Sequence, residues 1–210
     1  MIGIFRHHPL SSGDSCAGLI AALRGTYDIR LFTAEQCTDD ALAECELLAF
    51  PGGVGEADDW HRVLRPARGA VQRYVQANGA YLGICMGAYW AGKDYFDLLS
   101  DVYPMQYIRC ERTDIRRSYR TVAEVTWDGA PETMFFWDGP AFVSNARNYR
   151  TVAKYANGLP MAIMQRRVGL IGCHPEAMRT WYRSKKMAPL YHDGAHFELL
   201  REFVRELLER

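Results

Sequence analysis

Short apolar runs alternate with amphipathic segments along the first half of the chain, and this alternation constrains the fold most strongly. The apolar runs predict strands at residues 2–5, 27–32, 47–50 and 80–84. Helical spacing of apolar residues predicts helices between them, at about 14–24, just after 33, at 40–45 and at 65–76. We expect Asp14 or Ser15 to cap the first helix and Gly25 to end it. The pattern predicts an α/β fold with a mostly parallel sheet, helices on both faces and right-handed crossovers.

The second half of the chain has a different pattern, which indicates antiparallel pairing. Residues 121–127 and 134–137 flank the turn-rich segment 128–131, as the strands of a hairpin do. Residues 161–165 and 168–173 predict another hairpin, and both hairpins are expected to extend the sheet. Residues 172–176 are expected to lead into a helix, and the amphipathic segment 196–208 to form a helix that covers the sheet. With no repeat or linker in sight, residues 1–210 are interpreted as a single domain.

Charge and cysteine content exclude several classes of partner and cofactor. Lys plus Arg and Asp plus Glu both total 25, so no net charge draws the chain to nucleic acid or to a membrane surface. The N-terminus reaches basic residues too soon for a signal peptide, and we expect a cytoplasmic protein. Six widely spaced cysteines predict neither a metal site nor a disulfide framework, and no cofactor is expected.

The segment Gly83-Ile84-Cys85-Met86-Gly87 is the strongest chemical signal in the sequence. It follows a predicted strand and opens a predicted helix, which fits the sharp turn that presents a nucleophile above a sheet. Small neighbours suit such a turn because it leaves no space for flanking side chains. The first helical turn points backbone N–H groups toward the sulfur, which favours the thiolate of Cys85.

A nucleophilic cysteine needs a base and a group that orients the base. Both are available in His174-Pro175-Glu176, which follows the last predicted strand, at residues 168–171. If that strand runs parallel to the central strands, His174 emerges at the same edge as Cys85. Glu176 then accepts a hydrogen bond from the imidazole. The segment Pro51-Gly52-Gly53 follows the third strand, and its backbone N–H can join that of Met86 in an oxyanion hole.

Each of these segments has a simpler interpretation when it is taken alone. The glycine-flanked cysteine can be a tight turn around a buried thiol, His-Pro-Glu can be a helix start, and Pro-Gly-Gly can be an ordinary loop. Their order and their shared position at strand ends favour a joint catalytic site.

Taken together, these segments resemble the class I glutamine amidotransferase superfamily. Within it, residues 83–92 (GICMGAYWAG) and the opening Gly3-Ile4-Phe5-Arg6 are similar to the biotin-protein ligase N-terminal-like branch. The resemblance implies a flavodoxin-like three-layer sandwich. It also implies that Cys85 is the nucleophile, His174 the base and Glu176 its orienting partner. The N–H groups of Gly53 and Met86 are implied as the oxyanion hole.

One departure from the family pattern bears on the substrate. Glutamine-hydrolysing members typically carry His-Gln directly after the second glycine of the nucleophile turn, which is Gly87 here. This chain has Ala88 and Tyr89 at those positions, so free glutamine is not expected as substrate. The leading hypothesis is a Cys-His-Glu hydrolase or amidotransferase-like enzyme acting on an amide or acyl group of a small-molecule or peptide-like substrate. The alternative is a non-catalytic module that binds a ligand or protein. A redox or carbonyl-scavenging role ranks last, because the loop at 9–15 offers only Asp14 as a carboxylate.

Other residues are candidates for the walls of the pocket. We expect Gly52, Tyr89 and His7 to contact substrate. An aromatic wall and a polar lining are further candidates, formed by Trp60, Tyr89, Trp90 and Tyr95 and by Asp58 and Asp59 respectively. Five arginines between residues 109 and 120 surround Tyr119. They fit either an anion-binding site or a solvated loop, and these two interpretations stay open: Arg109, Arg112, Arg116, Arg117 and Arg120.

Overall fold

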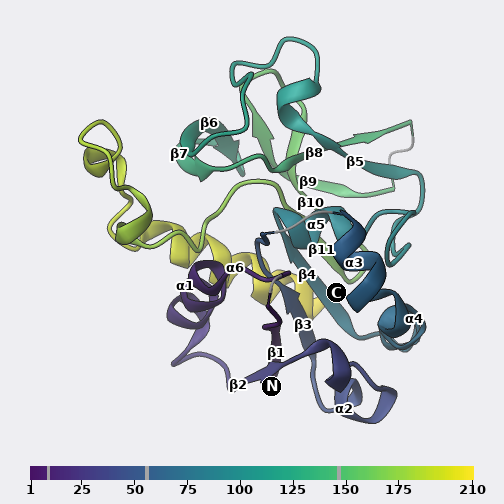
Figure 1. Ribbon diagram of the computed structural model, residues 1–210. Coiled ribbons are helices and arrows are strands. Elements are labelled where there is room, and N and C mark those ends of the chain that lie inside the picture. Colours follow the sequence, from purple (N-terminus) through teal and green to yellow (C-terminus); the bar gives the residue numbers. More distant parts are fainter. Residues whose placement is uncertain (9, 55–56, 146–147) are drawn as a thin grey trace.

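A nine-stranded sheet forms the centre of the molecule in the computed structural model, which describes residues 1–8, 10–54, 57–145 and 148–210 (Figure 1). Its strand order is β2-β1-β3-β4-β11-β10-β9-β6-β7. The first five strands of this order run parallel. They are β2 (Ile29–Phe32), β1 (Ile2–Phe5), β3 (Leu47–Phe50), β4 (Ala80–Ile84) and β11 (Val168–Ile171). The four parallel strands predicted in the first half of the chain are therefore confirmed.

The remaining strands of the sheet pair antiparallel, as the second half of the sequence predicts. They are β10 (Pro160–Gln165), β9 (Arg150–Tyr155), β6 (Thr121–Trp127) and β7 (Ala130–Phe136). Both predicted hairpins are present, as β6–β7 and β10–β11. A separate two-stranded sheet, β5 (Val102–Gln106) with β8 (Pro140–Ser144), was not predicted, and neither was β9.

Helices cover both faces of the parallel part (Figure 1). The α-helices are α1 (Gly13–Leu23), α2 (Asp39–Ala43), α3 (Ala57–Val63), α4 (Arg68–Gln76), α5 (Met86–Trp90) and α6 (Ala195–Glu209). The 3-10 turns are η1 (Ala34–Gln36), η2 (Arg65–Ala67), η3 (Tyr107–Arg109), η4 (Arg179–Trp181) and η5 (Ala188–Leu190). None of the helices in these described ranges is long and apolar enough to cross a bilayer.

Two sequence predictions about helices need correction. Ser12 caps α1, its hydroxyl accepting from the N–H of Ser15 at 3.3 Å, so neither Asp14 nor Ser15 is the cap. The helix expected after residues 172–176 does not form. The chain there turns and reaches only the three-residue η4, because Trp181 and Tyr182 pack onto Phe135 of β7.

The apolar core lies in two layers, one on each face of the parallel strands. On one face, Ile4 and Ile84 are buried in a cluster that includes Leu19 of α1 and Phe203 of α6. On the other, the rings of Phe5, Phe50 and Trp90 pack with aromatic residues of α3 and of the segment after α5. The flavodoxin-like three-layer sandwich is therefore confirmed.

The sheet order determines where the predicted motifs meet. Strands β3, β4 and β11 are neighbours and parallel, so their carboxyl ends lie at one edge. Residues 51–53, Cys85 and residues 172–176 follow directly after those three strands. In open α/β sheets this edge is where ligands bind.

Candidate active site

Cys85 occupies a strained turn between β4 and α5. Its backbone has φ 50° and ψ −104°, a conformation that non-glycine residues rarely adopt and that is found at functional sites. A Cβ on Gly87 would lie 2.0 Å from the carbonyl oxygen of Phe50, which explains why glycine follows the turn. Cys85 is buried, with 8% of the residue exposed, and its thiol donates to the carbonyl of Trp137 at 3.4 Å. The sequence predicts the turn correctly, but α5 has only five residues and contributes little helix dipole.

A buried chain of hydrogen bonds holds the imidazole of His174. Its Nδ1 lies 2.9 Å from Oε1 of Glu176. The same carboxylate oxygen accepts from the hydroxyl of Ser15 at 2.6 Å, and that hydroxyl accepts from the N–H of Gly52 at 2.9 Å. Because the carboxylate accepts from Nδ1–H, the Nε2 atom is the one available to a reacting group. Sequence reasoning identified Ser15 only as a possible helix cap.

The charge of Glu176 determines the protonation of His174. Burial alone lowers the pKa of this imidazole, but the Glu176 carboxylate and the Cys85 sulfur outweigh that effect and raise it to about 10. The ring is therefore protonated at neutral pH. An imidazolium beside a sulfur stabilises the thiolate, which is the nucleophilic form of cysteine. Within the described residues, Nε2 of His174 has no hydrogen-bond partner.

Gly53 and Met86, whose backbone N–H groups are the predicted oxyanion hole, line the same cavity as Cys85. Gly53 packs against Met86, since a Cβ on Gly53 would lie 2.8 Å from Cγ of Met86. Met86 is the first residue of α5, where the backbone N–H has no acceptor in its own helix. Residues 10–12 pair antiparallel with residues 52–54, with the Ser12 N–H donating to the Gly52 carbonyl and the Val54 N–H donating to the Leu10 carbonyl. The N–H of Gly53 is not used in these backbone hydrogen bonds. It can therefore form an oxyanion hole together with the N–H of Met86, as the sequence predicts.

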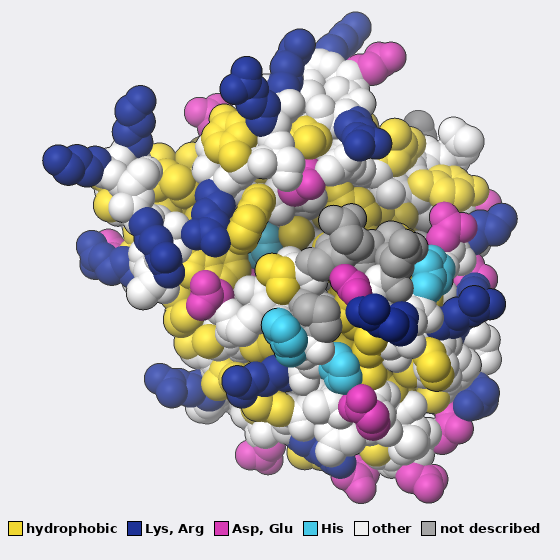
Figure 2. Space-filling model, in the orientation of Figure 1, with side chains coloured by type: hydrophobic (Ala, Val, Ile, Leu, Met, Phe, Trp, Pro, Cys, Tyr) yellow, Lys and Arg dark blue, Asp and Glu magenta, His cyan; other side chains and the backbone are white. Residues whose placement is uncertain are grey.

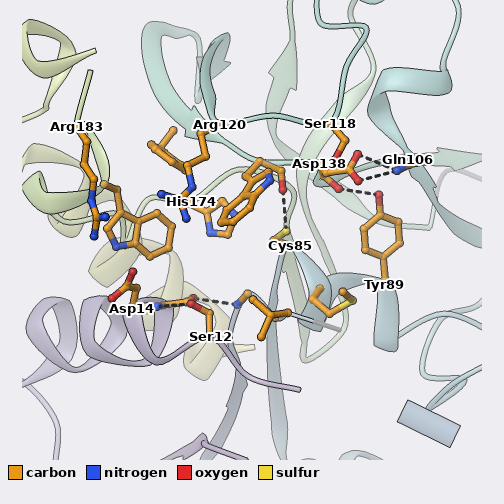
Figure 3. A pocket seen from close by; sticks show the side chains of 18 of the residues that line it. Ser12, Asp14, Cys85, Tyr89, Gln106, Ser118, Arg120, Asp138, His174 and Arg183 are labelled. Atoms are coloured by element: carbon orange, nitrogen blue, oxygen red, sulfur yellow. Dashed lines mark hydrogen bonds between the residues drawn. The ribbon is translucent and has the colours of Figure 1, made fainter. Parts of the chain in front are cut away.

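These groups surround a cavity of about 730 Å³, within the range of sites that bind small molecules. Cys85, His174, Gly52, Gly53, Met86 and Tyr89 all line it, so most of the predicted site residues are brought together (Figure 3). Glu176 lies behind His174, fully buried. Figure 2 shows a hollow on this face of the molecule, bordered by basic and apolar side chains.

The structure places other candidates away from the cavity. His7 stacks on Phe5, accepts from the N–H of Ala34 at 3.3 Å, and is not part of the lining. Of the proposed aromatic wall, Tyr89 and Tyr95 line the cavity, whereas Trp60 and Trp90 are buried in the core. Asp59 pairs with Arg62, and the side chain of Asp58 lies outside the described residues. Throughout the described ranges, no three His, Cys, Asp or Glu side chains are placed to hold a metal ion.

Comparison with known proteins agrees with this fold. Residues 9–98 match the family model described as biotin-protein ligase, N terminal. A solved glutamine amidotransferase aligns over 100% of this chain and 99% of its own, with a TM-score of 0.71 and 17% identity. A glutamine amidotransferase from Thermotoga maritima covers 100% of this chain and 98% of its own, with a TM-score of 0.67 and 13% identity. A third, from Methylobacillus flagellatus, covers 100% and 92%, with a TM-score of 0.61 and 11% identity. No curated protein matches the sequence.

The fold is the one seen in these solved glutamine amidotransferases. Residues 9–98 carry the resemblance to the biotin-protein ligase N-terminal family. Both resemblances expected from the sequence motifs are therefore confirmed. At identities of 11–17%, the likeness to the solved structures is one of fold, and the substrate has to be argued from the site itself.

The buried hydroxyl of Ser15 allows a prediction about stability. Replacing Ser15 by Ala leaves the Gly52 N–H without its acceptor and the Glu176 carboxylate without one donor. We expect a loss of about 2 kcal/mol in the free energy of unfolding, measured by urea denaturation. Ser184→Ala is the control, because its exposed hydroxyl only accepts from the N–H of Met187, and its change should stay within ~0.5 kcal/mol. Equal effects in the two variants would contradict a structural role for the Ser15 hydroxyl.

Proposed function

We propose that this protein is a hydrolase or amidotransferase-like enzyme in which Cys85, His174 and Glu176 act on an amide or acyl group. The observation that carries the proposal is the buried His174–Glu176 pair, 2.9 Å apart, in the cavity wall beside the strained Cys85 turn. A base oriented by a carboxylate next to a nucleophile is the arrangement that covalent acyl transfer requires.

The geometry supports the following sequence of steps. The Cys85 thiolate attacks the carbonyl carbon, forming a C–S bond while the carbonyl π electrons move to oxygen. The N–H groups of Gly53 and Met86 stabilise that oxyanion. Collapse of the intermediate expels the amine or alkoxide, which takes a proton from Nε2 of His174. Water or an amine then attacks the carbonyl carbon of the thioester and gives a proton back to His174. Collapse of this second intermediate breaks the C–S bond, releases the acid or amide product and restores the Cys85 thiolate beside the protonated His174.

The proposed substrate is a small-molecule or peptide-like compound other than free glutamine. Ala88 and Tyr89 occupy the positions where glutamine-hydrolysing members typically carry His-Gln. Ala88 is fully buried, and the Tyr89 phenol donates to the carbonyl of Asp138 at 3.1 Å. Neither side chain offers the amide that the family pattern supplies there.

Selective alkylation tests whether Cys85 is activated. We expect brief exposure to iodoacetamide at pH 7 to label Cys85 at least ~10-fold faster than Cys110, as measured by peptide mass spectrometry. Cys110 is the reference because it is only half-buried, and burial raises the pKa of its thiol. Labelling of Cys85 no faster than Cys110 would contradict the proposal and favour a non-catalytic binding module.

An activated ester then tests the chemistry itself. With p-nitrophenyl acetate, we expect a burst of one equivalent of nitrophenolate and an acetyl group on Cys85. Cys85→Ala should show no burst. Acetylation spread over surface lysines, with no burst, would argue against a nucleophilic role for Cys85.

A further inference from the structure

Three arginines from separate parts of the chain line the cavity that contains Cys85. Arg109 lies in η3, Arg120 directly precedes β6, and Arg183 follows η4. Among the described residues, none of the three forms an ion pair with a carboxylate. Arginines elsewhere, such as Arg68 and Arg73, do pair with aspartates. Unpaired guanidinium groups gathered at one cavity are suited to binding an anionic ligand.

Arg120 is held close to the nucleophile. Its guanidinium carbon lies 4.3 Å from the centre of the Trp137 ring, in a cation–π contact. The backbone carbonyl of that same tryptophan accepts from the Cys85 thiol at 3.4 Å. Stacking occupies the face of the guanidinium and leaves its N–H edge free for a planar carboxylate or a phosphate.

The side chain of Arg183 is held through its Nε atom rather than through its terminal amino groups. Its Nε donates to the carbonyl of Thr180 at 2.8 Å, so the terminal amino groups remain available. Figure 3 shows Arg120 and Arg183 on the same side of the cavity, beyond His174, whereas Tyr89, Gln106 and Asp138 lie on the opposite side of Cys85.

The acidic residues of the cavity do not cancel this charge. The carboxylate of Asp138 accepts two hydrogen bonds from the amide of Gln106, at 2.7 and 2.8 Å, on the far side. Asp14 of α1 is the acidic side chain on the arginine side. Two guanidinium groups therefore face one carboxylate there, and the arginine side keeps a positive charge.

We infer that the substrate carries, besides the acyl carbon attacked by Cys85, an anionic group that binds Arg120 and Arg183. That group is a carboxylate or a phosphate, both of which match the guanidinium edge. The inference rests on the proposed function for its catalytic meaning, but the binding of the anion does not require the thiol. It also favours the anion-binding interpretation for Arg120, one of the five arginines noted in the sequence.

Paired ester probes test this substrate class. Mono-p-nitrophenyl glutarate carries a free carboxylate, and its methyl ester is the matched neutral probe. We expect Cys85 to be acylated at least ~10-fold faster by the charged ester, as one charge-assisted interaction is worth about that factor. In the double variant Arg120→Gln, Arg183→Gln, the ratio of the two rates should fall to near one. Arg117→Gln is the control, because Arg117 is exposed and does not line the cavity. A ratio that stays the same in the double variant overturns the inference.

Direct binding separates this inference from the proposed function. Calorimetry on Cys85→Ala, with glutarate in one titration and inorganic phosphate in another, measures the anion site without the nucleophile. The inference is supported if either anion binds and this binding is lost when Arg120 and Arg183 are also replaced by Gln. The anion that binds more tightly then shows whether the substrate group is a carboxylate or a phosphate. No binding of either anion overturns it. If the protein binds an anion but Cys85 is not acylated, the anion site is supported and the proposed acyl-transfer reaction is contradicted.

Discussion

Exchange of Glu176 for Gln is expected to slow acylation of Cys85 by about 10³- to 10⁴-fold, the scale seen when the orienting carboxylate of a triad becomes an amide. The amide oxygen accepts from Nδ1–H of His174 more weakly than the carboxylate does, and the buried ring loses the negative charge that keeps it protonated. An amide of the same shape still fills the space, so the fold should survive. The measurement is the burst rate with p-nitrophenyl acetate, together with circular dichroism to confirm folding.

Glu132→Gln is the matched control for this variant. Glu132 also contacts a buried histidine, with its Oε2 3.2 Å from Nε2 of His196, but this pair does not line the Cys85 cavity. The same chemical change at this second His–Glu pair should leave the burst rate as it is in the wild type. If Glu176→Gln were acylated as fast as Glu132→Gln, the triad would be wrong.

Because the pKa of His174 is raised in the folded protein, the stability of the wild type should depend on pH, and this dependence should be weaker in Glu176→Gln. A histidine with a folded pKa of about 10 and an unfolded pKa of ~6.5 binds its proton more tightly in the folded state. Its contribution to stability is complete below ~6.5 and is lost as the pH rises toward 10. Urea midpoints should therefore fall between pH 6.5 and 9.5 by more in the wild type than in Glu176→Gln.

The parts of the site that the sequence reveals are those that follow directly after parallel strands. Residues 51–53, Cys85 and His174 each come immediately after a buried strand, so a correct strand order brings them to one edge without any knowledge of side-chain packing. Glycines on both sides of Cys85 indicate a turn because few other residues fit there. Local signals therefore predict that these three segments meet at one edge of the sheet.

The parts that the sequence does not reveal depend on contacts between distant segments. Ser15 reaches Glu176 across 161 residues, and nothing in the α1 sequence distinguishes that serine from the actual cap, Ser12. Trp137 contacts Cys85 only because the turn after β7 packs over the turn between β4 and α5. Arg183 is near the site because the segment after residue 176 packs its aromatic rings on β7 instead of forming a helix.

Replacing Gly18 by Ala is expected to destabilise the protein by about 3 kcal/mol and to disturb the site, although alanine is the better helix former. Gly18 lies within α1, and a Cβ there would stand 2.1 Å from the backbone carbonyl oxygen of Glu176. Backbone cannot swing aside as a flexible side chain does, so α1 or the Glu176 loop has to move. The loss corresponds to a fall in Tm of about 6–12 °C for a domain of this size.

Gly13→Ala provides the control within the same helix. A Cβ on Gly13 meets nothing within 4 Å, so this substitution should leave Tm unchanged or raise it slightly through the lower entropy of the unfolded chain. Because α1 also carries Ser15, displacement of the helix in Gly18→Ala should lengthen the contact between Ser15 and Glu176 and lower the burst rate as well. If Gly18→Ala were as stable as Gly13→Ala, the close packing of α1 against the Glu176 backbone would be wrong. The fold would then hold the Glu176 carboxylate less tightly than the structure indicates.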